Sequence, residues 1–270
     1  MRDTRRKSKT YEELDFTDDF MFCKIMQNYP ELCRELTEKI LGRKIGEIVM
    51  QESQKSIEIT ADGRGVRFDV YFEDDSLTVY DIEMQTYHDS DLPKRFRYYQ
   101  GMIDLNMMEH SAKFGELKNS YIVFICLENP YKIAGLHKYT ICNMCEEDPT
   151  IEFDDGAYHI ILSAEGDKDD VSEEMKAFLR YLTIKEVGSD FTRRLDERVG
   201  TARRHEKWRL EYMTLLERDE RMWEEGHREG ENLFALLVSK LMKEGRSEDV
   251  ERAATDEAYR KTLYAEYNLK

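Results

Sequence analysis

The sequence has no hydrophobic run that approaches the roughly 18 consecutive apolar residues of a membrane-spanning helix. The N-terminal stretch of residues 1–15 carries basic residues, but no apolar segment follows them, so the pattern of a secretory signal peptide is missing too. From these two absences we expect a soluble cytoplasmic protein with no membrane partner.

Cysteine is scarce, and the number of cysteines, five, is odd. Cys23, Cys33 and Cys126 lie in apolar surroundings, which predicts reduced, buried thiols and disfavours a disulfide framework. Cys142 and Cys145 have the spacing of half a zinc knuckle, but the sequence supplies no second pair of ligands. Structural thiols are therefore favoured over a metal site at these cysteines.

A basic excess, which is usual in nucleic-acid-binding proteins, is also absent. The chain has 41 Lys and Arg against 57 Asp and Glu, a formal net charge of −16 at pH 7. The acids concentrate at 146–155, at 165–174 and in the C-terminal third, whereas Lys94, Arg95 and Arg97 form a local basic cluster. An acidic surface weakens non-specific DNA binding, so only a local contact with nucleic acid is consistent with this charge.

Hydrophobic periodicity divides the chain into three parts. Residues 1–16 are polar and predict a flexible N-terminus, and residues 17–198 alternate between helical and strand patterns. Residues 199–270 have a charged helical pattern with a Glu-Gly repeat at 225–230. The sequence therefore predicts a mixed α/β domain followed by a helical C-terminal segment, which is a candidate surface for forming a homo-oligomer.

Two neighbouring segments of the middle part have the composition of half-buried β-strands. Residues 66–73 place apolar side chains at even positions, and residues 77–85 form a second run of strand-forming residues. The turn-forming residues 74–76 separate the two runs. The sequence thus predicts a β-hairpin over 66–85.

Acidic and amide side chains gather on one face of this hairpin. Asp81, Glu83 and Gln85 occupy alternate positions, so they share a face of the second strand. A turn of odd length brings Asp69 to the same face, opposite Asp81, with Glu83 one diagonal step away. A regular two-residue turn would send Asp69 to the other face, so a joint site requires an odd loop or a bulge.

Clustered carboxylates at this place indicate a candidate metal site. Like charges repel each other, burial increases the cost, and a bound Mg²⁺ relieves both effects. Such an ion can activate a water molecule and stabilise a leaving oxygen at phosphorus. The same acids could instead lie on the solvated face of an ordinary strand. Asp18 and Asp19 could add a further acid, although helix capping is favoured for them.

Four segments, taken in this order, resemble the Rpn family of recombination-promoting nucleases, also described as PD-(D/E)XK nuclease family transposases. The segments are 65–70 (GVRFDV), 80–85 (YDIEMQ), 94–100 (KRFRYYQ) and 120–126 (SYIVFIC). The similarity extends from about Phe16 into the C-terminal tail. It implies a restriction-endonuclease-like αββαβ core in a mixed α/β fold, with a helical C-terminal extension.

The resemblance also implies roles for individual residues. Asp69 and Glu83 match the two catalytic acids, which would bind Mg²⁺ or alternatively Mn²⁺. Gln85 matches the third catalytic position, where the wider superfamily has lysine. An uncharged amide can orient a water or a phosphate oxygen only by hydrogen bonding, so slower cleavage is expected. Arg95 and Tyr98 match the helix after the motif and are candidate contacts to DNA phosphates.

The sequence thus predicts a Mg²⁺-dependent DNA endonuclease that hydrolyses phosphodiester bonds, linked to recombination or mobile elements. One alternative is a catalytically weak nuclease fold that serves as a binding or regulatory module and self-associates through its C-terminal helices. Another alternative is a nuclease that processes RNA.

Overall fold

The computed structural model describes residues 9–53, 56–57, 65–108, 113–131, 135–151 and 153–269. Contacts between residues divide the chain into two compact units. One unit spans residues 9–205, and the other contains the C-terminal helices from Glu206 onward. Half of the N-terminus expected to be flexible, residues 1–8, lies outside the described residues. The segment boundaries expected at 16/17 and 198/199 stay predictions.

Helices and strands alternate along the first unit, and the second unit contributes three helices from its described residues. The helices are η1 Tyr11–Glu13, α1 Asp19–Asn28, α2 Pro30–Leu41, α3 Leu92–Met107, η2 Phe114–Glu116, α4 Glu173–Ile184, α5 Asp190–Ala202, α6 Glu206–Lys243, α7 Ser247–Thr255 and α8 Glu257–Glu266. The strands are β1 Ile48–Ser53, β2 Ser56–Ile57, β3 Val66–Arg67, β4 Val70–Asp74, β5 Val79–Gln85, β6 Ser120–Cys126, β7 Lys138–Ile141 and β8 Ala157–Ser163.

The first unit is built on a mixed sheet of six strands in the order β1-β4-β5-β6-β8-β7. Strands β5, β6 and β8 run parallel, and the remaining pairs are antiparallel. A separate two-stranded sheet pairs β2 with β3. This architecture confirms the mixed α/β fold with C-terminal helices that the sequence predicts.

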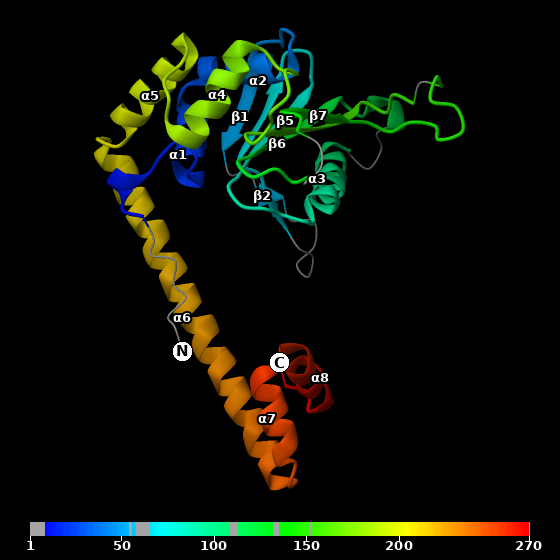
Figure 1. The fold of residues 1–270 in the computed structure, drawn as a ribbon, viewed down its shortest axis with the longest axis vertical. Helices are drawn as coiled ribbons and strands as arrows, with labels where there is room; N and C mark the ends of the chain where they lie inside the picture. The colour runs from blue at the N-terminus through cyan, green and yellow to red at the C-terminus, as the bar shows by residue number, and fades with distance from the viewer. Residues whose placement is uncertain are drawn as a thin grey trace. The chain divides into compact units, whose positions relative to one another are not determined.

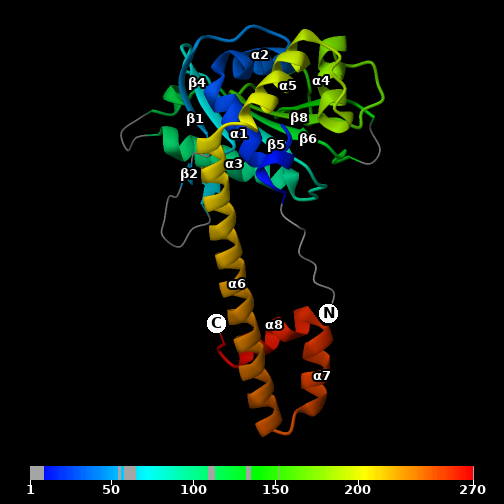
Figure 2. The same ribbon diagram turned by 90° about the vertical axis from the view of Figure 1, so that its left-hand side faces the viewer.

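Helices cover both faces of the six-stranded sheet. Figure 1 and Figure 2 show α1, α2, α4 and α5 on one face and α3 on the other. Under α3, the ring of Phe96 packs edge-on against Phe124 of β6 at 4.8 Å between centroids. On the opposite face, stacked rings of Phe72, Tyr80 and Tyr121 follow one another across β4, β5 and β6. The sheet is therefore buried on both faces, as the apolar run at 120–126 predicts.

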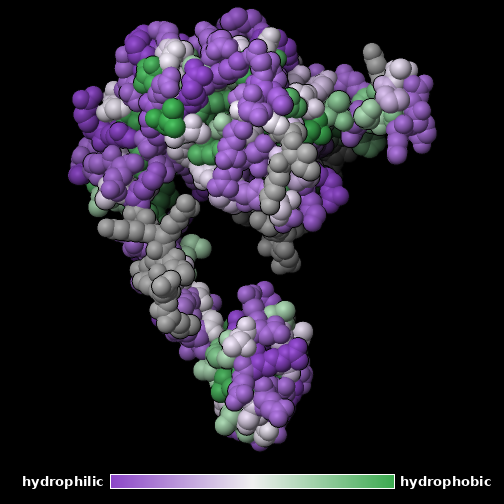
Figure 3. All heavy atoms as spheres, in the orientation of Figure 1, coloured by the Kyte–Doolittle hydropathy of each residue, from purple (hydrophilic) through white to green (hydrophobic). Residues whose placement is uncertain are grey.

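The surface is polar. Figure 3 shows hydrophilic residues over most of the face that it presents. Among the residues that the structure describes, no helix is both long enough and apolar enough to cross a bilayer.

The predicted hairpin is present, but its first strand is interrupted. Residues Val66–Arg67 pair with β2. The chain joins the six-stranded sheet only at Val70, where its pairing with β5 begins. Asp69 lies at the bend between the two strands. The expectation of one continuous strand over 66–73 is therefore wrong, because the backbone changes its hydrogen-bonding partner at this bend.

The register of the hairpin also differs from the expected one. Tyr71, not Asp69, lies opposite Asp81, and Val70 lies opposite Ile82. Continued by one residue, this pairing places Asp69 opposite Glu83. Odd positions still face odd positions, as the site requires, because an odd number of residues separates the last paired residues of the two strands.

The C-terminal unit has a small core of its own. Leu237, Leu241, Ala253 and Leu263 are buried between α6, α7 and α8. The helix α6 runs without a break through the Glu-Gly repeat of residues 225–230.

Candidate active site

The bend before β4 brings Asp69 and Glu83 together. The backbone N–H of Asp69 donates to Glu83 Oε1 at 2.9 Å. In return, the backbone N–H of Met84 on β5 donates to Asp69 Oδ2 at 3.2 Å. Each carboxylate is thus fixed by the backbone of the segment that bears the other, and both acids are held at one place.

Both carboxylates are nearly buried, with 9% of Asp69 and 4% of Glu83 exposed. Burial, and then the charges of Glu83 and Asp19, raise the pKa of Asp69. Burial also raises the pKa of Glu83, although the hydrogen bond from Asp69 and the charge of Arg95 oppose the rise. The two acids therefore resist simultaneous ionisation unless a cation joins them.

A third acid of the hairpin, Asp81, is completely buried on the same face of β5 as Glu83. Neither of its carboxyl oxygens has a hydrogen-bond partner among the described residues. Burial and the neighbouring charge of Glu83 raise its pKa well above the usual range. Asp81 adds to the carboxyl groups gathered here, although the register places it beside Tyr71 and away from Asp69.

Helix α1 contributes an acid for which the sequence favoured a capping role. Asp18 is the N-cap residue, so Asp19 is the first residue of the helix itself. Ligand atoms of Asp19, Cys23 and Asp69 all lie within 4.8 Å of one another. Asp19 also accepts a hydrogen bond from Arg67 Nη2 at 2.8 Å. Sequence periodicity gave no signal for this meeting, because it depends on how α1 packs beside β4.

The donor set fits a hard divalent cation. The Cys23 thiol donates to Asp19 Oδ1 at 3.4 Å. Burial and the charges of Asp69 and Asp19 raise the pKa of this thiol well above the usual range. Sulfur is moreover a soft ligand, which Mg²⁺ disfavours. The other two members of this group, Asp19 and Asp69, offer carboxylate oxygens, the ligand type that Mg²⁺ and Mn²⁺ prefer. The Glu83 carboxylate lies next to them, where it accepts the hydrogen bond from the Asp69 backbone.

Gln85 and Arg95 meet beside these acids. Arg95 Nη1 donates to Gln85 Oε1 at 2.7 Å and to Asp89 Oδ2 at 3.0 Å. Its Nη2 atom lies 3.7 Å from Glu83 Oε2. The other end of the Gln85 amide, Nε2, donates to the carbonyl oxygen of Tyr87 at 3.0 Å. Helix α3 thus delivers one guanidinium to the edge of the acidic cluster.

A cleft of about 610 Å³ opens beside Arg95. Its lining combines four cations, two acids and three tyrosines, namely Arg67, Lys94, Arg95, Arg97, Asp89, Asp91, Tyr87, Tyr98 and Tyr99. Tyr98 is 43% exposed. Tyr99 also lines the cleft, and its ring packs against Phe68 at 5.2 Å between centroids. Both adjacent tyrosines of α3 therefore border the cleft, and Tyr99 in addition contacts the core.

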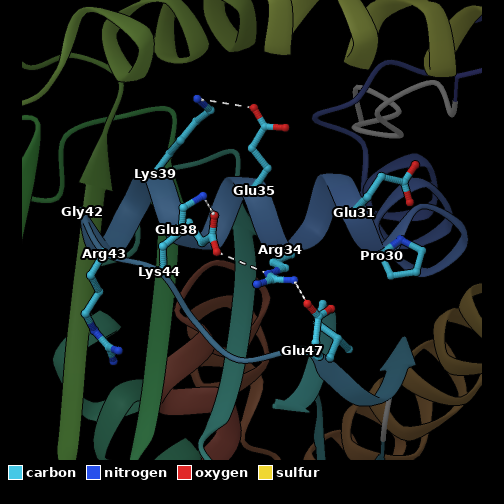
Figure 4. Close-up of a pocket in the computed structure, with 11 residues that line it drawn as sticks. Pro30, Glu31, Arg34, Glu35, Glu38, Lys39, Gly42, Arg43, Lys44 and Glu47 are labelled. Carbon is cyan, nitrogen blue, oxygen red and sulfur yellow. Dashed lines mark hydrogen bonds and ion pairs between the residues drawn. The ribbon is translucent and has the colours of Figure 1, made fainter. Parts of the chain in front are cut away.

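A second, wider groove of about 1050 Å³ lies along α2 and the loop that follows it. Figure 4 shows that its charged side chains pair with one another. Arg34 bonds to Glu38 and Glu47, and Lys44 bonds to Glu38. None of the acids that gather around Asp69 lines this groove. We assign it no part in the site.

The five cysteines are free thiols. Cys23, Cys33 and Cys126 are buried, as the sequence predicts, and Cys142 is exposed. Within the described part of the chain, neither Cys142 nor Cys145 joins a group of three potential metal ligands.

Comparison with known proteins gives one result. The model of the PD-(D/E)XK nuclease family transposases matches residues 16–225. No curated protein and no solved structure gives a match. The matched region spans more than half of the chain and includes Asp19, Asp69, Glu83, Gln85 and Arg95. The chain therefore belongs to the PD-(D/E)XK nuclease family transposases.

Proposed function

We propose that this protein is a Mg²⁺-dependent DNA endonuclease, with Mn²⁺ as an alternative ion. Asp69 and Glu83 are the catalytic acids and metal ligands in this proposal. The observation that supports it most directly is the pair of reciprocal hydrogen bonds that holds these two carboxylates together. Asp19, within 4.8 Å of Asp69 between ligand atoms, is a further candidate ligand.

The proposed reaction is hydrolysis of a phosphodiester. A water oxygen forms a bond to phosphorus while the bond from phosphorus to one sugar oxygen breaks. The water gives up a proton, and the leaving oxygen gains one. A bound divalent ion supplies Lewis acidity that favours the hydroxide form of water and stabilises the leaving oxygen. Asp69 and Glu83 hold their carboxylates in place through the backbone, so little reorganisation is needed during the reaction.

The cleft beside Arg95 is the proposed contact with DNA. Arg95 and Tyr98 are the candidate phosphate contacts, and both line the cleft. Lys94 is an exposed cation of the same cleft. A local basic cleft in a chain with a net charge of −16 restricts nucleic-acid contact to the region of the active site.

The biological setting is part of the same proposal. The family description contains the word transposase, and we place the cleavage in recombination or in the movement of mobile elements on that ground alone. The residues described above account for hydrolysis, and we propose no strand-transfer step.

Nicking of a supercoiled plasmid tests the proposed function. Asp69→Asn and Glu83→Gln remove a charge with little change of shape, and each should lower the rate at least about a hundredfold, because losing a metal ligand removes several kcal/mol of transition-state stabilisation. Asp104→Asn, on α3, is the matched control and should cut like the wild type. Unchanged cutting by both site variants would remove the catalytic proposal.

A panel of matched substrates tests the choice of DNA. Duplex DNA, single-stranded DNA and RNA of one sequence are incubated with the wild type and Mg²⁺. Preferential cleavage of the RNA would show that the sequence-based alternative of RNA processing is right and the DNA assignment wrong.

Self-association through the C-terminal helices is a second, separate proposal. The helix α6 exposes large apolar side chains along its length, among them Leu210, Met213, Met222 and Trp223. Residues 217–232 of this helix are all exposed. Exposed apolar surface of this kind marks interaction sites on soluble proteins. If nuclease activity is absent, this surface would support the alternative role of a binding or regulatory module.

A further inference from the structure

Two arginines reach the acidic cluster: Arg67 bonds to Asp19, and Arg95 lies beside Glu83. In phosphodiester hydrolysis, negative charge develops on the phosphate oxygens at the transition state. Within the described ranges, the ion pair to Glu83 comes from Arg95, at 3.7 Å between Nη2 and Oε2. The Arg95 guanidinium also stacks over the ring of Phe124, 4.7 Å from its centroid. Helix α3 therefore fixes a cation beside Glu83.

Gln85 has a different task from the one the sequence suggests. Both ends of its amide bind within the protein, Oε1 to Arg95 and Nε2 to the Tyr87 carbonyl. The side chain is 4% exposed. An amide engaged in this way holds a neighbouring group in place and has no charge of its own to offer a phosphate.

Arg95 is fixed on one side and open on the other. Its guanidinium bonds to Gln85, Asp89 and the Tyr99 hydroxyl, which leaves it few other orientations. The side chain is nevertheless 27% exposed and lines the cleft. A planar guanidinium has five donors, so it can keep these bonds and still donate to a phosphate oxygen.

The family name specifies a lysine at the last position of its motif, and this chain has Gln85 there. Because Gln85 Oε1 lies 2.7 Å from Arg95 Nη1, a lysine at position 85 would place its ammonium close to where the guanidinium now lies. The charge is therefore present in this structure, but it comes from α3 and not from β5.

We propose that Arg95 supplies the positive charge that stabilises the attacked phosphate, and that Gln85 is the positioning residue that holds the Arg95 guanidinium beside Glu83. This inference rests on the proposed nuclease function. It assigns the charge of the motif lysine to a residue of another element, and it changes Gln85 from a catalytic residue to a support for one.

A rescue experiment distinguishes an electrostatic role of Arg95 from a purely structural one. Arg95→Ala should lower kcat about 10²- to 10³-fold, as removal of one preorganised donor does in other enzymes, with a smaller change in KM. The double variant Arg95→Ala with Gln85→Lys should have a kcat at least tenfold higher than that of Arg95→Ala, because the lysine ammonium returns the positive charge to the same place. The matched control is Arg43→Ala. Arg43 also stacks on a ring of β6, that of Tyr121, with its guanidinium carbon 5.1 Å from the ring centroid, and its loss should leave kcat unchanged.

Calorimetric titration with Mn²⁺ gives a readout other than activity. Loss of Arg95 removes a cation near Glu83, so Arg95→Ala should bind Mn²⁺ at least as tightly as the wild type. Weaker Mn²⁺ binding by Arg95→Ala would mean that the arginine only supports the fold of the site, and that would overturn the inference.

The kinetic outcomes distinguish the two proposals. A wild type that cuts no DNA in Mg²⁺ or Mn²⁺ would overturn the proposed function. A wild type that cuts, with Arg95→Ala equally fast, would overturn only the role of Arg95. A double variant as slow as Arg95→Ala would also overturn it.

Discussion

Asp69 illustrates, at the scale of one residue, how a site can oppose the stability of the protein that contains it. Its carboxyl is nearly buried beside Glu83, and burial and that charge raise its pKa above the value in an unfolded chain. The folded state therefore favours the protonated form. As pH rises from the unfolded value, about 4, through the raised folded value, folding stability is lost.

Asp69→Asn should therefore stabilise the metal-free protein at alkaline pH. The amide cannot ionise in either state, so the variant avoids the loss of stability that arises in the wild type when the unfolded chain gives up the Asp69 proton and the folded protein keeps it. We expect its free energy of unfolding in EDTA at pH 8.5 to exceed that of the wild type by about 1–3 kcal/mol, since one pKa unit is worth about 1.4 kcal/mol. Urea denaturation at pH 8.5 and pH 5 measures the difference, which should shrink at the lower pH.

Asp170 provides a control, because its pKa is shifted in the opposite direction to that of Asp69. Although partial burial works the other way, hydrogen bonds from Lys138 and His137 lower the pKa of Asp170. Its ionised form stabilises the fold above the unfolded pKa, so Asp170→Asn should destabilise the protein at pH 8.5. If both aspartate variants lose stability at that pH, the repulsion argued for Asp69 is absent.

Individual site residues could be named from the sequence because strand alternation decides which side chains share a face. That rule places Glu83 and Gln85 together on β5, and the structure keeps them on one face of that strand. It could not choose between Asp81 and Glu83 as the residue opposite Asp69, since that depends on loop length. It also gave no reason to expect Asp19 beside Asp69, because packing of α1 on the sheet leaves no periodic signal.

At the scale of elements, the loop between β4 and β5 determines the register of the site. Asp74 fixes the loop, since its carboxylate accepts bonds from the backbone of Ser76 and Thr78 and from the Tyr80 hydroxyl. Leu77 completes the turn with a φ of 62°. A left-handed backbone at a residue with a large side chain costs about 1–2 kcal/mol. Leu77 is 57% exposed, so packing of its side chain compensates little of this cost.

Leu77→Gly should therefore increase stability. Glycine adopts positive φ without the steric cost, and part of that gain is offset by its greater freedom in the unfolded chain. We expect the free energy of unfolding to rise by about 1 kcal/mol. Leu77→Ala keeps a Cβ atom and should stay close to the wild type. Equal stability of the glycine and alanine variants in urea denaturation would show that Leu77 is unstrained.

Most elements follow from local patterns, and the exceptions depend on distant partners. Helix α2 begins at Pro30 and ends before Gly42, whose φ is 72°, and both residues are typical of these positions. The apolar run at 120–126 identifies β6. The break between β3 and β4 could not be predicted, because apolar alternation continues across Phe68 and Asp69 while the hydrogen-bonding partner changes from one sheet to another.

At the scale of the molecule, composition limited the possible functions more than it identified one. A net charge of −16 disfavours broad contact with nucleic acid, and the structure shows the compatible arrangement, a basic cleft beside the acids. The charged pattern after residue 199 predicted helices, and α6 to α8 are helices. The small core around Leu241 was not predictable, since it forms only when α7 and α8 fold back on α6.

The exposed apolar side chains of α6 predict self-association, which the mass of the protein in solution would show. Met222 and Trp223 are 63% and 49% exposed, in a stretch where every residue is exposed. If this part of α6 pairs with a second copy, the wild type should have a mass above the 32.2 kDa of one chain in light scattering. Met222→Lys with Trp223→Lys should return the mass to that of one chain, because burying two charged ammonium groups opposes pairing. Leu105→Lys, at a site on α3 that is 61% exposed, is the control and should leave the mass unchanged. A wild type that already has the mass of a single chain would contradict self-association through α6.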